Sequence, residues 1–352
     1  MFSVFMLKLA KSILKTNTMK TFKNVLKLIS FTLLPLCSFA QSPTYVAEKT
    51  IALTGNGGYD YAFIDQDARV LYASHGTAVN VVDLQTEKQV AVISGMKGVH
   101  GIAVVKDLNR GFISDGKGSA VIAFDTKTFK TIKVIPVTGK DADGIIYDPF
   151  SKKVFVFGGD DHAAMVVDPQ ELKQVSNVDL GGAPEFAVSD GNGLIYNNLE
   201  DKSSLNVIDA KTLKVIKNYP LSPCGGPTGL AIDKDNQRLF TVCRENKGMS
   251  VIDIATGKVV QTLPIGAGVD AVIYDPANKL VVASNGDGTA TIFKQNSPDS
   301  YTLSQTLKTQ NRAKTMAMDM STHKLYFPVV DFQPGTRTPI PDSFKLLVYK
   351  PN

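Results

Sequence analysis

The chain has 352 residues with a formal charge of +5, and 43% of them are hydrophobic. Its first forty residues contain six lysines and no acidic residue, so +5 less six leaves about −1 for the remainder. A near-neutral chain lacks the cationic surface that contacts phosphates, which argues against a nucleic-acid partner.

Residues 1–40 have the features of an export signal. Lysines precede an apolar stretch at residues 28–36, and Ser38-Phe39-Ala40 has the small-x-small form that signal peptidase cleaves. Met19 heads a tidier signal and is an alternative start. No later stretch is apolar for long enough to span a bilayer. We therefore expect an exported, periplasmic or secreted protein, cleaved near Ala40, with one domain at residues 41–352 and no transmembrane segment.

A sequence unit recurs seven times, with a first β-rich run in each copy. These runs occupy residues 61–65, 101–105, 144–148, 186–190, 229–233, 271–275 and 316–319. Three further β-rich runs follow in the first six units and two in the seventh, separated by Asn, Asp and Gly turns. Four short strands per repeat are typical of a propeller blade. The sequence thus predicts an all-β, seven-bladed β-propeller with four-stranded blades.

The two ends of the repeat predict how the ring closes. The seventh unit stops after its third strand at Lys350, whereas residues 45–53 (YVAEKTIAL) resemble a fourth strand with no blade before it. If this N-terminal strand completes the last blade, no open sheet edge remains.

Three segments carry a family resemblance. VIDIATGKVV at residues 251–260 has equivalents in VVDLQTEKQV at 81–90 and VIDAKTLKVI at 207–216. This motif resembles the YVTN-repeat, or YncE-like, exported β-propellers, over essentially all of residues 45–350. The resemblance implies the fold and export. It does not imply a reaction, because propellers host hydrolases, lyases, binding proteins and scaffolds.

One position in the repeat places polar residues at one mouth of the propeller. The residue before each first strand recurs at steps of 40 to 45 residues and is Asp60, His100, Asp143, Glu185, Thr228, Asp270 and Thr315. Asp and Thr at a strand start can simply accept a backbone N–H. Glu185 and His100 are not preferred turn residues. Converging carboxylates also repel one another unless they are protonated, hydrated or bound to a cation.

Loops between the second and third strands open on the same face. They contribute His75, Asp115, Asp160, Asp161, His162, Glu200, Arg244, Asn285 and Asp287. Imidazole with carboxylate suits a divalent transition metal, and carboxylate with amide oxygen suits calcium. No HxH or HExxH spacing is present. Candidate metal ligands are His75, His100, Asp143, His162, Glu185 and Asp270.

Two further features belong to this face. Cys224 and Cys243 both fall at the site-facing end of the fifth unit, and we expect a disulfide there in an oxidising compartment. A long proline-rich loop at residues 329–343 interrupts the last unit. It either covers the ring closure or acts as a lid, with Arg337 joining Arg312, Lys314 and Arg244 around an anionic ligand.

The sequence favours a monomeric binding protein for a small molecule, metal ion or protein at the channel mouth. The expected ligand-binding residues are Asp60, His100, Asp143, Glu185, Thr228, Arg244, Asp270, Thr315 and Arg337. One alternative is a metal-assisted hydrolase or lyase of the lactonase type, with His100, Asp143, Glu185 and Asp270 as catalytic candidates. A protein-interaction scaffold is the other. A divalent metal ion is the one cofactor that these residues suggest.

Overall fold

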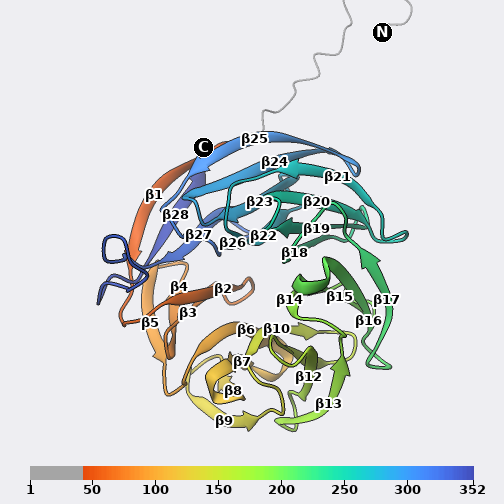
Figure 1. The fold of residues 1–352 in the computed structure, drawn as a ribbon. Coiled ribbons are helices and arrows are strands. Elements are labelled where there is room, and N and C mark those ends of the chain that lie inside the picture. Colours follow the sequence, from red (N-terminus) through yellow and green to blue (C-terminus); the bar gives the residue numbers. More distant parts are fainter. Residues whose placement is uncertain (1–42) are drawn as a thin grey trace, which may run out of the picture. The chain divides into compact units, whose positions relative to one another are not determined.

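The computed structural model describes residues 43–352, and the predicted signal peptide at residues 1–40 lies outside them. The described residues form seven four-stranded sheets, arranged as blades around a central axis (Figure 1). The all-β seven-bladed propeller that the repeat predicted is confirmed. We call the space enclosed by the first strands the central channel.

The first four blades follow one another along the chain, each in sheet order. Blade 1 contains β2 (Tyr59–Asp65), β3 (Val70–His75), β4 (Ala78–Asp83) and β5 (Lys88–Ile93). Blade 2 contains β6 (Val99–Val105), β7 (Arg110–Asp115), β8 (Ala120–Asp125) and β9 (Thr131–Pro136). Blade 3 contains β10 (Ala142–Asp148), β11 (Lys153–Gly158), β12 (Ala163–Asp168) and β13 (Lys173–Asp179). Blade 4 contains β14 (Pro184–Ser189), β15 (Leu194–Leu199), β16 (Ser204–Asp209) and β17 (Lys214–Pro220).

Blades 5 and 6 repeat this order, and blade 7 combines both ends of the propeller. Blade 5 contains β18 (Pro227–Asp233), β19 (Arg238–Cys243), β20 (Gly248–Asp253) and β21 (Val259–Pro264). Blade 6 contains β22 (Val269–Asp275), β23 (Leu280–Asn285), β24 (Thr289–Ser297) and β25 (Ser300–Lys308). Blade 7 contains β26 (Ala317–Asp319), β27 (Lys324–Val329), β28 (Lys345–Pro351) and β1 (Tyr45–Ala52). Three short 3₁₀ helices are η1 (Lys106–Leu108), η2 (Gly116–Gly118) and η3 (Glu200–Lys202).

The sequence pattern explains the layers within a blade. Second and third strands are buried almost throughout, as β11 shows, whereas the outer strand β13 alternates between exposed and less exposed residues. The hydrophobic core therefore lies between blades. One cluster joins Val105 and Phe112 of blade 2 to Val156 and Met165 of blade 3.

An aspartate at the end of the third strand explains the repeated motif. In blade 1, Asp83 accepts the backbone N–H of Thr86 at 2.7 Å, and Asp209 accepts that of Thr212 at 2.7 Å in blade 4. The carboxylate thereby replaces a backbone acceptor and fixes the turn into the fourth strand. The motif is thus accounted for by turn geometry.

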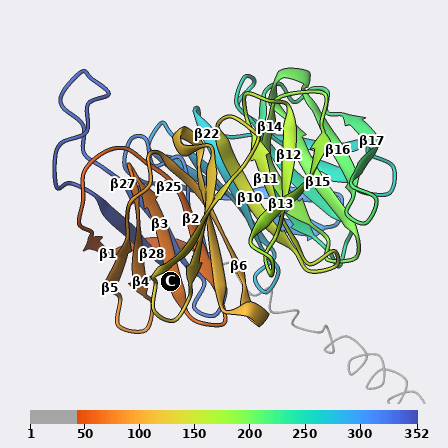
Figure 2. The same ribbon diagram turned by 90° about the horizontal axis from the view of Figure 1, so that it is seen from below.

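The first strand closes the ring as predicted. Antiparallel pairing runs from Tyr45 opposite Pro351 to Ala52 opposite Lys345, so β1 is the fourth strand of blade 7 (Figure 1). The long loop between β27 and β28 projects beyond the strands (Figure 2). Within residues 43–352, no helix has the length and apolar character that a membrane crossing requires.

Candidate functional site

A break in strand pairing determines where the seven entry residues lie. We call these residues, from Asp60 to Thr315, the polar ring. In blades 1 to 6 the register between first and second strands shifts at the entry position, for instance between Val99 and Ile102 and between Ala142 and Ile145. A bulge of this kind releases a residue from the ladder and redirects its side chain. His100 and Asp143 each fall in such a break, at one mouth of the channel.

Buried polar residues of the second strands support the released backbone. Ser114 donates its hydroxyl to the carbonyl oxygen of Asp143 at 2.5 Å, and Asn197 donates its amide to that of Glu185 at 2.9 Å. Both side chains are fully buried. They replace ladder hydrogen bonds that the bulge removes, and unpaired carbonyls would otherwise be costly. The ring therefore stands on a rigid support.

One histidine lies at the centre of three carboxylates. His100 Nδ1 is 2.7 Å from Asp60 Oδ2 and 3.4 Å from Asp143 Oδ1, and its Nε2 is 3.6 Å from Asp141 Oδ1. A Cβ on Gly116 would lie 2.9 Å from His100 Nε2 and 2.6 Å from Asp141 Oδ1, so only glycine leaves room for this approach. We call Asp60, His100, Asp141 and Asp143 the histidine cluster.

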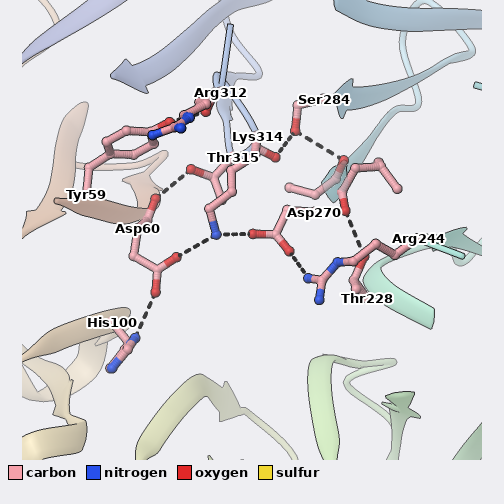
Figure 3. A network of polar contacts seen from close by, with 12 residues as sticks. Tyr59, Asp60, His100, Thr228, Arg244, Asp270, Ser284, Arg312, Lys314 and Thr315 are labelled. Carbon is pink, nitrogen blue, oxygen red and sulfur yellow. Dashed lines mark hydrogen bonds and ion pairs between the residues drawn. The ribbon is translucent and has the colours of Figure 1, made fainter. Parts of the chain in front are cut away.

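Alternating charges continue the ring on its other side (Figure 3). Lys314 Nζ lies 3.6 Å from Asp60 Oδ1 and 2.5 Å from Asp270 Oδ2. Arg244 pairs with Asp270 and with Glu200, each at 2.7 Å. Asp270 is only 8% exposed and holds a cation on each carboxylate oxygen. This side is internally neutralised, unlike the histidine cluster.

The pKa values of three residues in the polar ring differ strongly from their ordinary values. Burial alone would lower the pKa of His100, but its hydrogen bond to Asp60 and the nearby carboxylates raise it to about 9. Burial, with the charge of Asp60, raises the pKa of Asp143 to about 7. Burial, with the charges of Asp270 and Asp143, raises the pKa of Glu185 to about 9. Crowded carboxylates favour the neutral form in this way.

The donor set of the histidine cluster suits a metal ion. One donor atom each of Asp60, His100 and Asp143 lies within 4.8 Å of the other two. The Oδ1 atom of Asp143 is also inaccessible to solvent and accepts no hydrogen bond within residues 43–352. Two ligands of a tetrahedral ion at about 2.1 Å are about 3.4 Å apart. The 3.4 Å between His100 Nδ1 and Asp143 Oδ1 matches that spacing, whereas the 2.7 Å between His100 Nδ1 and Asp60 Oδ2 is a hydrogen-bond distance that a bound ion would lengthen.

Two other residues of the polar ring form hydrogen bonds with backbone carbonyl oxygens. Thr228 is fully buried, and its hydroxyl lies 3.4 Å from the carbonyl oxygen of Val269 in β22 of the next blade. Thr315 donates to the carbonyl oxygen of Asp60 at 2.5 Å (Figure 3). These threonines brace neighbouring first strands rather than face the channel mouth.

Three sequence candidates lie apart from the histidine cluster. His75 is 3% exposed, stacks on Phe344 with ring centroids 4.7 Å apart, and has its Nδ1 3.1 Å from Asn80 Oδ1. Its burial lowers its pKa. His162 and Arg337 are exposed on loops. Sharing a face of the propeller therefore does not bring these side chains to the axis.

The cysteines and the long loop also support this face. Cys224 and Cys243 form a disulfide with an S–S distance of 2.01 Å in the core between blades 4 and 5. Arg312, which lies between β25 and β26, stacks its guanidinium 4.2 Å from the ring centroid of Phe332 in the loop and donates to the carbonyl oxygen of Thr336 at 3.1 Å. Arg312 is thus engaged in holding the loop.

An aromatic pair crosses the channel beneath the ring. Tyr61 of blade 1 stacks on Phe186 of blade 4, with ring centroids 4.8 Å apart. Each directly follows a ring residue, whereas the same repeat position is glycine at Gly101, Gly144 and Gly229. Small residues there leave space for the two rings to meet. This pair was not predicted from the sequence, although a Tyr and a Phe at a repeat position that is glycine in three other blades were a visible signal.

Asp141 was also missed. It directly precedes β10 and has a backbone φ of 52°, so strand alternation does not place its side chain. No repeat position in the sequence marked it.

The comparisons with known proteins concern the fold. A family model described as a YNCE-like beta-propeller matches residues 156–277, which confirms the resemblance expected from the repeat. No curated protein matches the chain. Among solved structures, one titled "Crystal Structure of Mitotic Checkpoint Complex" has a TM-score of 0.70 at 12% identity, covering 88% of this chain and 92% of that one.

A second solved structure is the Kuenenia stuttgartiensis hydrazine synthase. Its TM-score is 0.51 at 16% identity, covering 69% of this chain and 97% of that one. At such identities both likenesses show the fold alone, because one fold hosts many functions.

Proposed function

We propose that this YNCE-like β-propeller is an exported binding protein whose channel mouth holds a divalent transition-metal ion. Asp60, His100 and Asp143 would be its ligands, with Asp141 beside them. The observation that carries the proposal is Asp143 Oδ1, a solvent-inaccessible carboxylate oxygen that has no hydrogen-bond donor among residues 43–352 and lies 3.4 Å from an imidazole nitrogen. A buried carboxylate oxygen in this position is costly unless a cation or proton satisfies it.

The charge distribution supports a cation on this side of the ring. The histidine cluster contains three carboxylates around one imidazole, whereas Asp270 already has Lys314 and Arg244 as partners. A bound divalent ion would replace the proton of His100 and relieve the repulsion between Asp60 and Asp143. Imidazole and carboxylate together favour a transition metal such as Zn²⁺ over Ca²⁺.

The test is direct titration of chelator-stripped mature protein with Zn²⁺, Mn²⁺ or Ca²⁺, followed by calorimetry. We expect one saturable Zn²⁺ site per chain, with affinity that rises between pH 6 and pH 9 because the ion displaces a proton from His100. His100→Gln should abolish the site. If none of the three ions binds saturably, the proposal is refuted.

A metal-assisted hydrolase or lyase of the lactonase type is the second candidate. It is favoured by Glu185, whose pKa is raised to about 9, so that its carboxyl group is protonated at neutral pH and can donate a proton. Three protein ligands would leave a coordination position for a substrate carbonyl, which a metal ion polarises. Turnover of a lactone panel by Zn²⁺-loaded protein, abolished in Glu185→Gln with Zn²⁺ affinity retained, would support this candidate over simple binding.

Export is supported by the cysteines. The Cys224–Cys243 disulfide requires an oxidising compartment, as the periplasm or the extracellular space provides. N-terminal sequencing of protein from that compartment should find Gln41 as the first residue. The ligand-bearing mouth would then face extracytoplasmic solutes, and a protein-interaction scaffold remains the alternative if titration finds no small ligand.

A further inference from the structure

The opposite half of the central channel, away from the histidine cluster, contains a cavity. It has a volume of about 480 Å³ and lies on the side of the Tyr61–Phe186 pair that faces the ends of the first strands. First strands of blades 1 to 4 form most of its wall, and blade 5 completes it with Ile232 of β18 and with Lys234, directly after that strand. Its size is within the range of small-molecule sites.

The wall of this cavity is apolar. It includes Phe63, Val104, Ile146 and Val188, which are all only partly buried, so the described chain leaves them incompletely covered. Covering apolar surface contributes about 25 cal/mol for each Å² removed from water. These side chains therefore favour a ligand with an apolar body.

Charge at the rim limits the class of ligand further. Lys234 is the one Lys, Arg, Asp or Glu among the residues that line the cavity, and it is exposed. Ser189, which also lines the cavity, donates its hydroxyl to Asp148 at 2.6 Å and is already engaged. An apolar wall with a single cation at its edge fits a molecule with one anionic end.

We propose that this cavity binds a small amphipathic anion, such as a medium-chain or aromatic carboxylate. Its apolar body lies against the Tyr61–Phe186 pair, and its carboxylate lies at Lys234. This inference does not depend on the metal site, because the stacked pair separates the two halves of the channel.

The experiment is calorimetric titration of the mature protein with dodecanoate and with dodecanol, in the presence of chelator. We expect one dodecanoate per chain, bound at least about tenfold more tightly than dodecanol, as a pairing worth about 1.4 kcal/mol gives. Lys234→Ala should remove this preference and retain dodecanol binding. Equal affinities for the two ligands in the unmodified protein, or no saturable binding, would overturn the proposal.

A fluorescent variant locates the ligand independently. The chain has no tryptophan, so Phe63→Trp introduces a single reporter into the cavity wall. Dodecanoate should shift its emission to shorter wavelength. Leu303→Trp, at a residue 59% exposed on the outer strand β25, is the matched control and should not respond. An unchanged Phe63→Trp spectrum at saturating dodecanoate would place the ligand elsewhere and overturn the proposal. Dimerisation of the chain during the titration would also overturn it, because it would indicate that the apolar wall is a self-association face.

Discussion

The two halves of the central channel are built by the same strands yet differ in chemistry. At the strand starts, bulges direct ionisable side chains such as His100 and Asp143 to the mouth. Towards the strand ends the regular ladder resumes, and residues such as Val104 and Ile146 line an apolar cavity. An interruption of strand pairing, rather than the fold as such, therefore determines where the propeller concentrates charge.

Removing one carboxylate should have the largest effect. Asp143→Asn keeps the shape of the side chain but removes an anionic ligand, so Zn²⁺ affinity should fall at least about 100-fold, or about 3 kcal/mol. Calorimetry measures this change. Asp160→Asn changes the same charge at an exposed loop residue of the same face and should leave the affinity unaltered. Equal affinity of the Asp143→Asn and unmodified proteins would exclude Asp143 as a ligand.

Breaking the aromatic pair that separates the two halves of the channel should lower the stability of the fold. Phe186→Ala removes the ring that stacks on Tyr61 and should lower the free energy of unfolding by about 2–3 kcal/mol, since Phe186 is partly buried. Chemical denaturation measures the loss. Phe150→Ala is the control, because Phe150 is 50% exposed and should cost less than about 0.5 kcal/mol. Similar losses in both variants would mean that the stacked pair has no particular role.

The mouth should make stability depend on pH. Because the folded state raises the pKa of Glu185 to about 9, it binds more protons than the unfolded state from about pH 4.5 upward. Stability is then greatest below the unfolded pKa and is lost as pH rises through about 9. Asp143, with a pKa raised to about 7, acts in the same direction.

Glu185→Gln isolates this contribution. Between pH 5 and pH 8 the unmodified protein should lose up to about 1 kcal/mol per pH unit relative to the variant. Thermal unfolding at several pH values, without divalent ions, gives the comparison. A difference that grows in the opposite direction with pH would show that Glu185 is charged in the folded protein.

Removing a competing cation should have the smallest effect. Lys314 lies 3.6 Å from Asp60, so its charge opposes a cation bound at the histidine cluster. Lys314→Met should tighten Zn²⁺ binding several-fold, by about 1 kcal/mol. The same change should lower the free energy of unfolding of the metal-free protein. Arg244→Met removes a cation that pairs with Asp270 and Glu200 instead and should change Zn²⁺ affinity less. Weaker Zn²⁺ binding in Lys314→Met would contradict the proposed electrostatics.

Sequence reasoning could predict the repeat, the ring closure and the entry positions, because strand periodicity and repeat spacing are local properties. It could not predict which side chains of this face come into contact. His75 and His100 share a face, yet His75 packs against Phe344 between blades, at the end of a second strand. Radial distance from the axis depends on which strand carries a residue and on the local bulge.

Pairing between blades was also beyond reach. Lys314 contacts Asp60 and Asp270, which belong to blades on either side of it in the ring. The sequence suggested only that Lys314 could join other cations around an anion. Side-chain reach across the channel decides such pairs, and no spacing along the chain encodes it.

The placement of β1 in blade 7 has a consequence for biogenesis. Its partner β28 spans Lys345–Pro351, so the strand that begins the propeller cannot dock until these residues have been synthesised. Pairing of such distant segments is a slow, late step in folding. If the protein is exported as proposed, its seventh blade can be completed only after both β1 and β28 have crossed the membrane.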